Sequence, residues 1–373
     1  MSENKIKEMI AGTFLEIADA LETGTFGKQT VIGVAVSGTE HGMDNIYEGV
    51  RLAEKKGCKA VVIEGEDAHK KMEQMMDAGE IDGAVTMHYP FPIGVSTVGR
   101  VITPGCGREM FLATTTGTSS TDRVEGMIKN AVYGIIAAKA SGIEHPTVGI
   151  ANVDGARQTE KALRRLQENG YDISFAESSR ADGGVVMRGN DLLAGTADVM
   201  VMDPLTGNLM MKIFSAYTTG GSYESLGYGY GPGIGEGYDR VVMIISRASG
   251  APVIAGAIEY AAQLISNKVG RIAETEFAAA RQAGLEAVLA ELKPAKSGGA
   301  DASAAPAVMP AKEVVTYEIH GIEVIDLDDA AASLWAKGIY AETGMGCTGP
   351  VILVSEANGE KARDVLKASD YIV

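Results

Sequence analysis

The amino-acid sequence predicts an α/β protein with one open, mostly parallel sheet, helices on both faces, and a smaller α/β module at the C-terminal end. Three observations lead to this fold class. Short β-branched runs such as 31–36 and 60–63 alternate with longer stretches of helical spacing. A buried parallel strand reads as a continuous apolar run, and a crossover helix lies between two such strands. A segment of mostly Ala, Pro, Gly and Ser at 294–312 then sets off a final structured stretch.

The elements of the core follow in order. Residues 6–21 place apolar side chains near helical spacing, which predicts an N-terminal amphipathic helix within residues 1–22. The expected strands are 31–36, 60–63, 83–86, 111–114, 147–152, 173–176, 197–202 and 241–246. The expected helices are 43–56, 68–78, 122–140, 157–169, one from about 208, 256–267 and 271–292. Because these strands exceed what one compact sheet needs, a second lobe is expected within the core over residues 1–293.

The C-terminal part is predicted to be a tethered module. Residues 294–312 cannot bury enough apolar area to offset their ordering entropy, which is typical of a flexible linker. A linker of 19 residues spans roughly 20–25 Å. Residues 313–373 regain structure and carry Cys347. The expected elements are strands near 314–318, 322–326 and 351–354, helices at 328–337 and about 358–368, and a Gly-rich loop at 343–350.

Composition limits the classes of partner and site. A formal charge of −16 argues against nucleic acid and anionic membranes as partners. No uncharged apolar stretch is long enough to span a membrane, and the start MSENKIKEMIAG lacks the order of a signal peptide. Three cysteines are too few for a disulfide framework, so the cytoplasm is expected. The five histidines form no HxxxH pair, and neither a metal nor a cofactor is expected.

The first candidate site is a strand-to-helix turn at 203–212. In an open α/β sheet, ligands bind beyond the carboxyl ends of strands, where the first amides of the next helix carry partial positive charge. Thr206 offers a hydroxyl and Gly207 allows close backbone approach, while Asn208 can cap or donate. Lys212 lies one turn further along the helix. This pattern predicts a phosphate cradle without a metal. The alternative is an ordinary capped turn with a surface lysine.

Three loops rich in glycine and hydroxyl groups also follow apolar runs. Residues 37–42 (SGTEHG) do not form GxGxxG, so a dinucleotide fold is not indicated. Residues 114–122 are nearly all hydroxyl or glycine. Residues 227–237 (GYGYGPGIGEG) look mobile and are a lid candidate. Each loop has an alternative as a solvated connection, and their position at strand ends favours a shared cleft.

The second candidate site is Cys347, in the glycine-flanked motif TGMGCTGP. Such a backbone lets an acyl carbonyl approach and can present amide donors to an oxyanion. The reactive thiolate needs a nearby cation, but the nearest preceding basic residue is Lys337, so activation must come from elsewhere. The alternative is a thiol in a tight turn. Cys106, in TPGCGREM with Arg108 two residues on, is a secondary thiol candidate.

The stretch 143–212 resembles the phosphate acyltransferases of fatty acid and phospholipid synthesis. IEHPTVGIAN, GNDLLAGTADVMVMD and PLTGNLMMK stand in the order of that family, and DPLTGNLMMKI is also similar to phosphotransacetylases, which make acetyl phosphate. The resemblance covers roughly residues 28–270. It implies a two-lobed α/β fold of the isocitrate-dehydrogenase-like type, with an acyl phosphate as substrate or product.

Residue by residue, the family's phosphate site matches four positions of this chain and its EAN-type motif matches a fifth. The four are Thr206, Gly207, Asn208 and Lys212. Asn190 matches the asparagine of the EAN-type motif, although Arg188 and Gly189 replace its acidic and small residues.

The C-terminal stretch GIYAETGMGCTGPVILVS is instead similar to component C subunits of the glycine reductase complex, found in amino-acid-fermenting anaerobes. That resemblance implies that an acetyl group arrives from a carboxymethylated selenoprotein, component A. It implies that Cys347 holds the acetyl group as a thioester and that inorganic phosphate releases it as acetyl phosphate. It also implies a second, ketoacyl-synthase-like component C subunit, in a homo-dimer or hetero-oligomer.

This hypothesis has a chemical logic. Phosphate is already an anion, so it needs positioning and charge compensation rather than a general base. Lys212 and the amides after Asp203 are expected to supply both. Three other interpretations stay open. The chain could be a free-standing phosphate acyltransferase acting on acyl carrier protein, or a non-catalytic assembly subunit. A decarboxylating dehydrogenase is suggested by fold analogy alone and lacks clustered aspartates and a cofactor loop.

Overall fold

The fold is given by a computed structural model of the 373-residue chain. It describes residues 7, 14, 29–36, 38–181, 183–292, 309–322, 326–346, 349–369 and 371–372. The expected N-terminal helix, most of the expected linker, and Cys347 lie outside the described residues.

The described chain alternates strands and helices. The strands are β1 (Val31–Ala35), β2 (Lys59–Ile63), β3 (Gly83–Thr86), β4 (Phe91–Pro92), β5 (Val95–Ile102), β6 (Glu109–Thr118), β7 (Thr147–Ala151), β8 (Ser174–Phe175), β9 (Val186–Met187), β10 (Val199–Val201), β11 (Gly231–Ile234), β12 (Val242–Ile244), β13 (Tyr317–His320), β14 (Ala341–Gly346) and β15 (Gly349–Val354). The α-helices are α2 (Gly42–Glu54), α3 (Ala68–Asp77), α4 (Arg123–Ala140), α5 (Ala156–Glu168), α6 (Gly189–Ala194), α7 (Pro204–Ala216), α8 (Ala251–Ser266), α9 (Val269–Gln282), α10 (Leu285–Leu292), α11 (Leu327–Trp335) and α12 (Gly359–Ala368). Of these helices, none is both long and apolar enough to cross a membrane.

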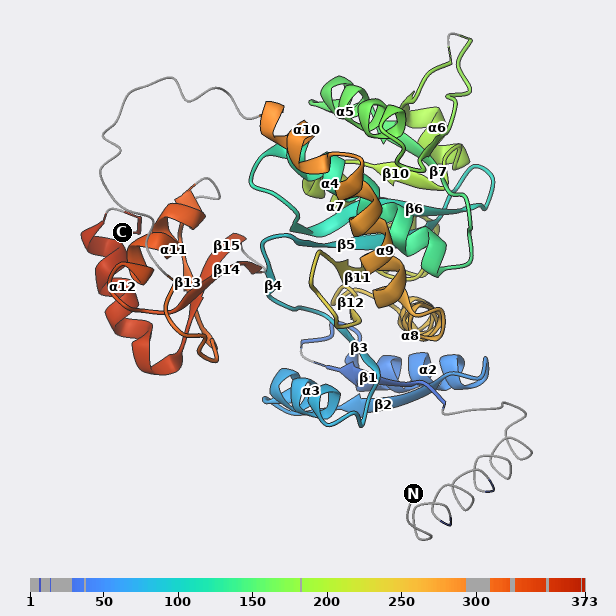
Figure 1. The fold of residues 1–373 in the computed structure, drawn as a ribbon. Coiled ribbons are helices and arrows are strands. Elements are labelled where there is room, and N and C mark those ends of the chain that lie inside the picture. The colour runs from blue at the N-terminus through green and yellow to red at the C-terminus, as the bar shows by residue number, and fades with distance from the viewer. Residues whose placement is uncertain are drawn as a thin grey trace.

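The described strands form one large mixed sheet and one small sheet (Figure 1). The large sheet has the order β2-β1-β3-β12-β11-β5-β6-β10-β7-β8, with β9 beside β7. A first parallel block contains β2, β1, β3 and β12, and a second contains β6, β10, β7, β8 and β9. Between them, β11 and β5 make antiparallel pairs. The α/β class and the mostly parallel sheet are therefore confirmed, while the antiparallel centre was not expected.

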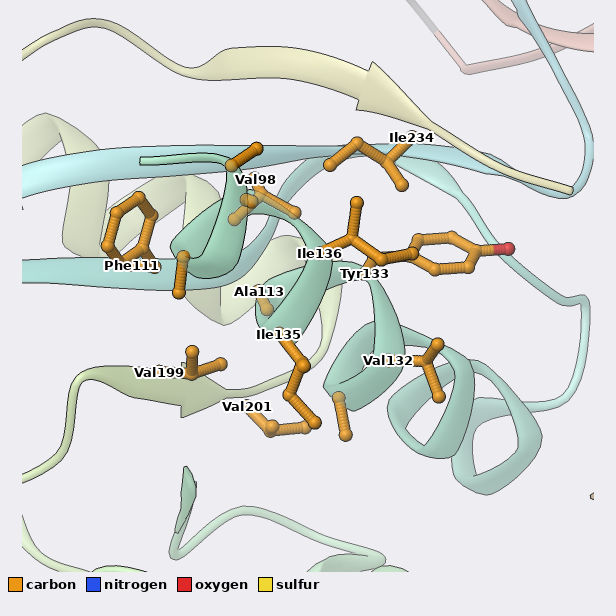
Figure 2. Packing of buried hydrophobic residues seen from close by; sticks show 14 of the residues in the cluster. Val98, Phe111, Ala113, Val132, Tyr133, Ile135, Ile136, Val199, Val201 and Ile234 are labelled. Atoms are coloured by element: carbon orange, nitrogen blue, oxygen red, sulfur yellow. The ribbon is translucent and has the colours of Figure 1, made fainter. Parts of the chain in front are cut away.

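Strand β6 shows how both faces of the large sheet are covered. Phe111 and Ala113 belong to the core that α4 closes, whereas Met110 and Leu112 belong to the core that α7 closes. Successive side chains of a strand point to opposite faces, so one strand serves two cores. Figure 2 shows side chains of α4 against β5, β6 and β10. The hydroxyl of Tyr133 on α4 also donates to the Gly94 carbonyl at 2.7 Å.

Two sequence predictions are wrong, and the positions of glycine residues explain both differences. The lid candidate 227–237 contains β11, which is buried between β12 and β5. A Cβ at Gly231 would overlap the Val98 carbonyl oxygen, so only glycine allows this approach. The helix expected over 271–292 is divided into α9 and α10, because the chain turns at Gly284 with a φ of +87°.

The small sheet joins the C-terminal segment to the core. Its order is β13-β15-β14-β4, so a strand of the core forms one edge (Figure 1). Gly344 pairs with Pro92 and Met345 with Phe91, and the Ile93 amide donates to the Thr343 carbonyl at 3.2 Å. The loop expected at 343–350 is instead largely the ends of β14 and β15, whose apolar faces pack under α11 and α12. The strand expected at 322–326 falls largely outside the described residues.

Candidate functional site

The N-terminus of α7 is closed by its own capping residue. The Asp203 carboxylate accepts hydrogen bonds from the Leu205 and Thr206 amides, both at 3.1 Å, and from the Thr206 hydroxyl at 2.6 Å. Pro204 has no N–H, and the Gly207 amide bonds to the Asp203 carbonyl. A buried carboxylate therefore takes these amides, as in the ordinary capped turn given as the alternative, and their role toward a ligand stays a prediction.

Gly207 and Asn208 fix α7 against β6. A Cβ at Gly207 would overlap the Thr114 carbonyl oxygen and lie 2.8 Å from its carbon, so the helix packs directly on the strand backbone. The Asn208 side-chain amide donates to the Thr115 carbonyl at 3.0 Å. Both residues therefore position the helix that carries Lys212.

Lys212 lies where the two parallel blocks meet. Its ammonium donates to Glu224 Oε1 at 2.6 Å and to the Ser246 hydroxyl at 2.9 Å. The Tyr230 ring centroid is 5.8 Å away. Helix α7 follows β10 of the second block, whereas Ser246 follows β12 of the first. The Lys212 side chain is 45% exposed and that of Glu224 is 0% exposed, so the ammonium stands between a buried carboxylate and solvent.

A second cation follows Ser246. Arg247 is exposed, and its guanidinium forms no ion pair with the carboxylates in the described part of the chain. Beside it, the Thr86 carbonyl at the end of β3 accepts from the Ile245 amide at 2.9 Å. Burial lowers the pKa of His88 below its ordinary value, against the opposing charge of Glu318. The carboxyl ends of β3 and β12 thus form one polar edge, in which Arg247 is a cation and the lowered pKa of His88 favours its neutral imidazole.

Two other candidate residues lie apart from Lys212. Asn190 is exposed in α6, and its side chain makes no hydrogen bond to α7 among the described residues. Cys106 is exposed in the turn between β5 and β6. From Glu109, where β6 begins, to Thr115, which contacts Asn208, the strand extends about 20 Å. Among the described residues, no hydrogen bond joins Asn190 or Cys106 to Lys212.

Asp191, the residue after Asn190, is a buried carboxylate that accepts several hydrogen bonds. Asp191 is 0% exposed and accepts hydrogen bonds from the Ser178 hydroxyl at 2.8 Å and from the Ser179 and Arg188 amides, both at 2.9 Å. Burial alone would raise the pKa of this carboxyl. The hydrogen bonds from Arg188, Ser179 and Ser178 outweigh burial and lower the pKa from 3.8 to about 2.

Asp191 is expected to make the free energy of unfolding decrease as the pH falls into the acid range. Because its pKa is lower in the folded state, the unfolded chain binds more protons between pH 3.8 and about 2. The contribution of Asp191, about 2 kcal/mol, is therefore complete above that window and is lost as the pH falls through it. Urea unfolding from pH 7 to pH 2 should show this extra slope, and Asp191→Asn should remove it. Equal slopes in both proteins would contradict the assignment.

The sequence analysis missed the partners of Lys212. Ser246 ends the apolar run 241–246. Ligands bind beyond the carboxyl ends of strands, and this principle, which pointed to the turn after Asp203, also points to Ser246. Glu224 carries no such signal, because it lies in a glycine- and serine-rich connection after α7. Among the residues that the structure describes, no three His, Cys, Asp or Glu side chains group together as metal ligands.

Comparisons with known proteins agree with the resemblances of the sequence. A family model described as "Fatty acid synthesis protein" matches residues 30–353. Glycine/sarcosine/betaine reductase complex component C subunit alpha of Peptoclostridium acidaminophilum is 58% identical over 384 residues, covering 98% of this chain and 99% of that protein. A phosphate acyltransferase of Bacillus licheniformis is 25% identical over 239 residues, covering 56% of this chain and 67% of that enzyme. The chain therefore belongs to the fatty acid synthesis protein family and, within it, groups with the component C alpha subunits of glycine/sarcosine/betaine reductase complexes.

Proposed function

We propose that this chain transfers an acetyl group from a thioester on Cys347 to inorganic phosphate, giving acetyl phosphate. The similarity to a component C subunit and to phosphate acyltransferases supports acyl transfer in general. The observation that carries the finer proposal is the Lys212 ammonium, which is held by Glu224 and Ser246 and is open to solvent. We propose that Arg247, which follows Ser246 in the chain, supplies a second cation, because a phosphate dianion is bound better by cations than by neutral groups.

The proposed step balances without a cofactor. A phosphate oxygen attacks the thioester carbonyl, forming a C–O bond and a tetrahedral oxyanion. The C–S bond then breaks, and the electron pair leaves on sulfur. The proton of hydrogen phosphate moves to that sulfur, so the products are the Cys347 thiol and acetyl phosphate. Lys212 and Arg247 hold the phosphate and offset its charge, while Thr206, Gly207 and Asn208 hold the helix that carries Lys212.

The small sheet joins the β14–β15 hairpin to the core. Gly346 and Gly349, which flank the two residues outside the description, pair with each other, and β14 pairs with β4. Phe91 of β4 lies five residues after Thr86, at most about 17 Å along an extended chain. Thr86 in turn contacts Ile245, next to Ser246. These contacts connect the hairpin, through β4 and the end of β3, to the segment that carries Ser246.

The partners are also proposed from the similarity to a component C subunit. The relative from Peptoclostridium acidaminophilum is a subunit of a glycine/sarcosine/betaine reductase complex. We expect a second, ketoacyl-synthase-like component C subunit and a carboxymethyl-selenoprotein, component A, as donor of the acetyl group.

The proposal predicts an acetyl adduct on Cys347. The full chain is incubated with [¹⁴C]acetyl phosphate, digested under mild acid that preserves thioesters, and mapped by mass spectrometry. The wild type and Cys106→Ser should carry label on the peptide that contains residue 347, and Cys347→Ser should carry none there. An acetyl adduct that persists in Cys347→Ser would overturn the assignment. Turnover of long-chain acyl phosphates in preference to acetyl phosphate would favour a phosphate acyltransferase acting on acyl carrier protein.

A further inference from the structure

A fully buried carboxylate lies directly behind the Lys212 ammonium. Oε1 of Glu224 accepts hydrogen bonds from Lys212 Nζ at 2.6 Å and from the Tyr230 hydroxyl at 3.0 Å. Oε2 accepts from the Ser249 hydroxyl at 2.7 Å. A buried charge is tolerated when it is paired and hydrogen-bonded, and this carboxylate meets both conditions. The donors come from α7, from the residue just before β11, and from the segment between β12 and α8.

The backbone of Glu224 is fixed as firmly as its side chain. Its amide donates to the Ala248 carbonyl at 2.9 Å, and its carbonyl accepts from the Gly250 amide at 2.8 Å. A Cβ at Gly250 would lie 2.9 Å from that carbonyl oxygen, so the two segments are in close contact. The carboxylate therefore cannot follow Lys212 if the lysine side chain swings outward.

This arrangement sets the direction of the ammonium. A lysine ammonium has three N–H donors, and Glu224 and Ser246 accept two of them. A free lysine side chain loses rotamer entropy when a ligand orders it, whereas a side chain held in advance has already lost it. The charge of Glu224 is buried behind the ammonium, so the side of Lys212 that faces solvent presents the remaining donor.

We infer that Glu224 is a positioning residue for Lys212. It aims the remaining N–H of the ammonium at the incoming phosphate, while Tyr230 and Ser249 hold the Glu224 carboxylate in turn. Glu224 touches no reacting atom and acts through Lys212. The inference rests on the proposed function, because it takes phosphate as the anion that binds at Lys212.

The chain contains a matched control. Glu276 is also buried and accepts hydrogen bonds from a lysine, Lys139, at 2.7 Å and from a tyrosine, Tyr171, at 3.0 Å. This second cluster joins α4 to α9 and has no hydrogen bond to Lys212 or Ser246. A purely structural role predicts that Glu224→Gln and Glu276→Gln behave alike, whereas a positioning role predicts that they differ.

The experiment measures exchange of [³²P]phosphate into acetyl phosphate by the full chain, together with the melting temperature of each variant. Glu224→Gln should raise the phosphate KM about tenfold and raise the acetyl phosphate KM in the same direction, because the phosphoryl group of acetyl phosphate binds at the same ammonium. Glu276→Gln should lower the melting temperature and leave both KM values unchanged. Tyr230→Phe, which removes a single donor to Glu224, should raise the phosphate KM in the same direction by a smaller factor.

The outcomes separate this inference from the proposed function. If Glu224→Gln shifts only the melting temperature, as Glu276→Gln does, the positioning role is wrong. If Glu224→Gln does not fold, an unchanged phosphate KM in Tyr230→Phe overturns it instead. If Lys212→Met keeps wild-type exchange, the proposed phosphate site itself fails. Loss of exchange in Lys212→Met with a normal phosphate KM in Glu224→Gln leaves the site standing and removes only the positioning role.

Discussion

Replacing Lys212 by methionine is expected to lower kcat/KM for phosphate about a hundredfold or more, since one preorganised donor to developing charge is typically worth this much. The ammonium is the group that Glu224 and Ser246 hold in a fixed place, and methionine keeps the length of the side chain without its charge. Isotope exchange between [³²P]phosphate and acetyl phosphate measures the effect. Wild-type exchange in this variant would leave a non-catalytic assembly subunit as the better description.

Two controls separate chemistry from folding in this experiment. Lys139→Met removes a lysine from a similar buried pair, that with Glu276, and should leave exchange unchanged. Lys212→Met also leaves Glu224 buried without its ammonium, and breaking such a pair costs about 3–5 kcal/mol. The double variant Lys212→Met/Glu224→Gln removes the orphaned charge. It should regain part of the lost melting temperature and none of the lost exchange.

Replacing Gly207 by alanine is expected to destabilise the fold by about 2 kcal/mol or more, although alanine is the better helix former. The added methyl group would overlap the Thr114 carbonyl oxygen, and no rotation of an alanine side chain relieves a clash with backbone. Helix α7 would have to move away from β6 and carry Asn208 and Lys212 with it. Urea unfolding measures the loss, and the isotope exchange assay should show reduced activity in the folded fraction.

The matched control for Gly207→Ala is Gly270→Ala. Gly270 also lies in a helix, α9, but nothing lies within 4 Å of its added Cβ. There the substitution should be neutral or stabilise by up to about 1 kcal/mol, because only helix propensity changes. If Gly207→Ala and Gly270→Ala shift stability in the same direction, the close packing of α7 on β6 is not what holds this helix.

The parallel strands could be predicted because burial on both faces leaves a continuous apolar run. Residues 83–86 were predicted as a strand and form β3 with the same bounds. Strand β5 was missed because it buries Ser96 and Thr97, whose polar side chains interrupt the run. Both side chains find partners only in the fold: Ser96 donates to Asn130, and Thr97 bonds to Thr115.

Strand β11 was missed for the opposite reason. Its glycines made the segment look mobile, but they are required because neighbouring backbone and rings lie too close for side chains. A Cβ at Gly233 would overlap the Phe91 ring, and one at Gly231 would lie 2.9 Å from the Gly99 amide nitrogen. Composition alone does not distinguish a glycine that makes the backbone flexible from a glycine that is required because a neighbouring atom lies too close for a side chain.

The candidate site was predicted in part. The position of the turn beyond a strand end and the family resemblance both pointed to Lys212. In the structure, hydrogen bonds to Glu224 and Ser246 give its ammonium a defined position. Its partner Glu224 could not be predicted, because a contact between side chains 12 residues apart depends on how the chain turns after α7. The capping bonds of the helix amides follow from a local cause, since Asp203 comes after the strand and is also the N-cap of the helix.

The shared strand β4 has a consequence for how the core behaves on its own. A chain shortened to end after α10 lacks β14, so Phe91 and Pro92 are left as an open edge. Open edges invite strand addition by a second copy. Here Pro90 and Pro92 flank Phe91, and proline has no N–H to offer a neighbouring strand. The vacated edge is therefore a poor template, and the shortened core resists edge-to-edge aggregation at this strand.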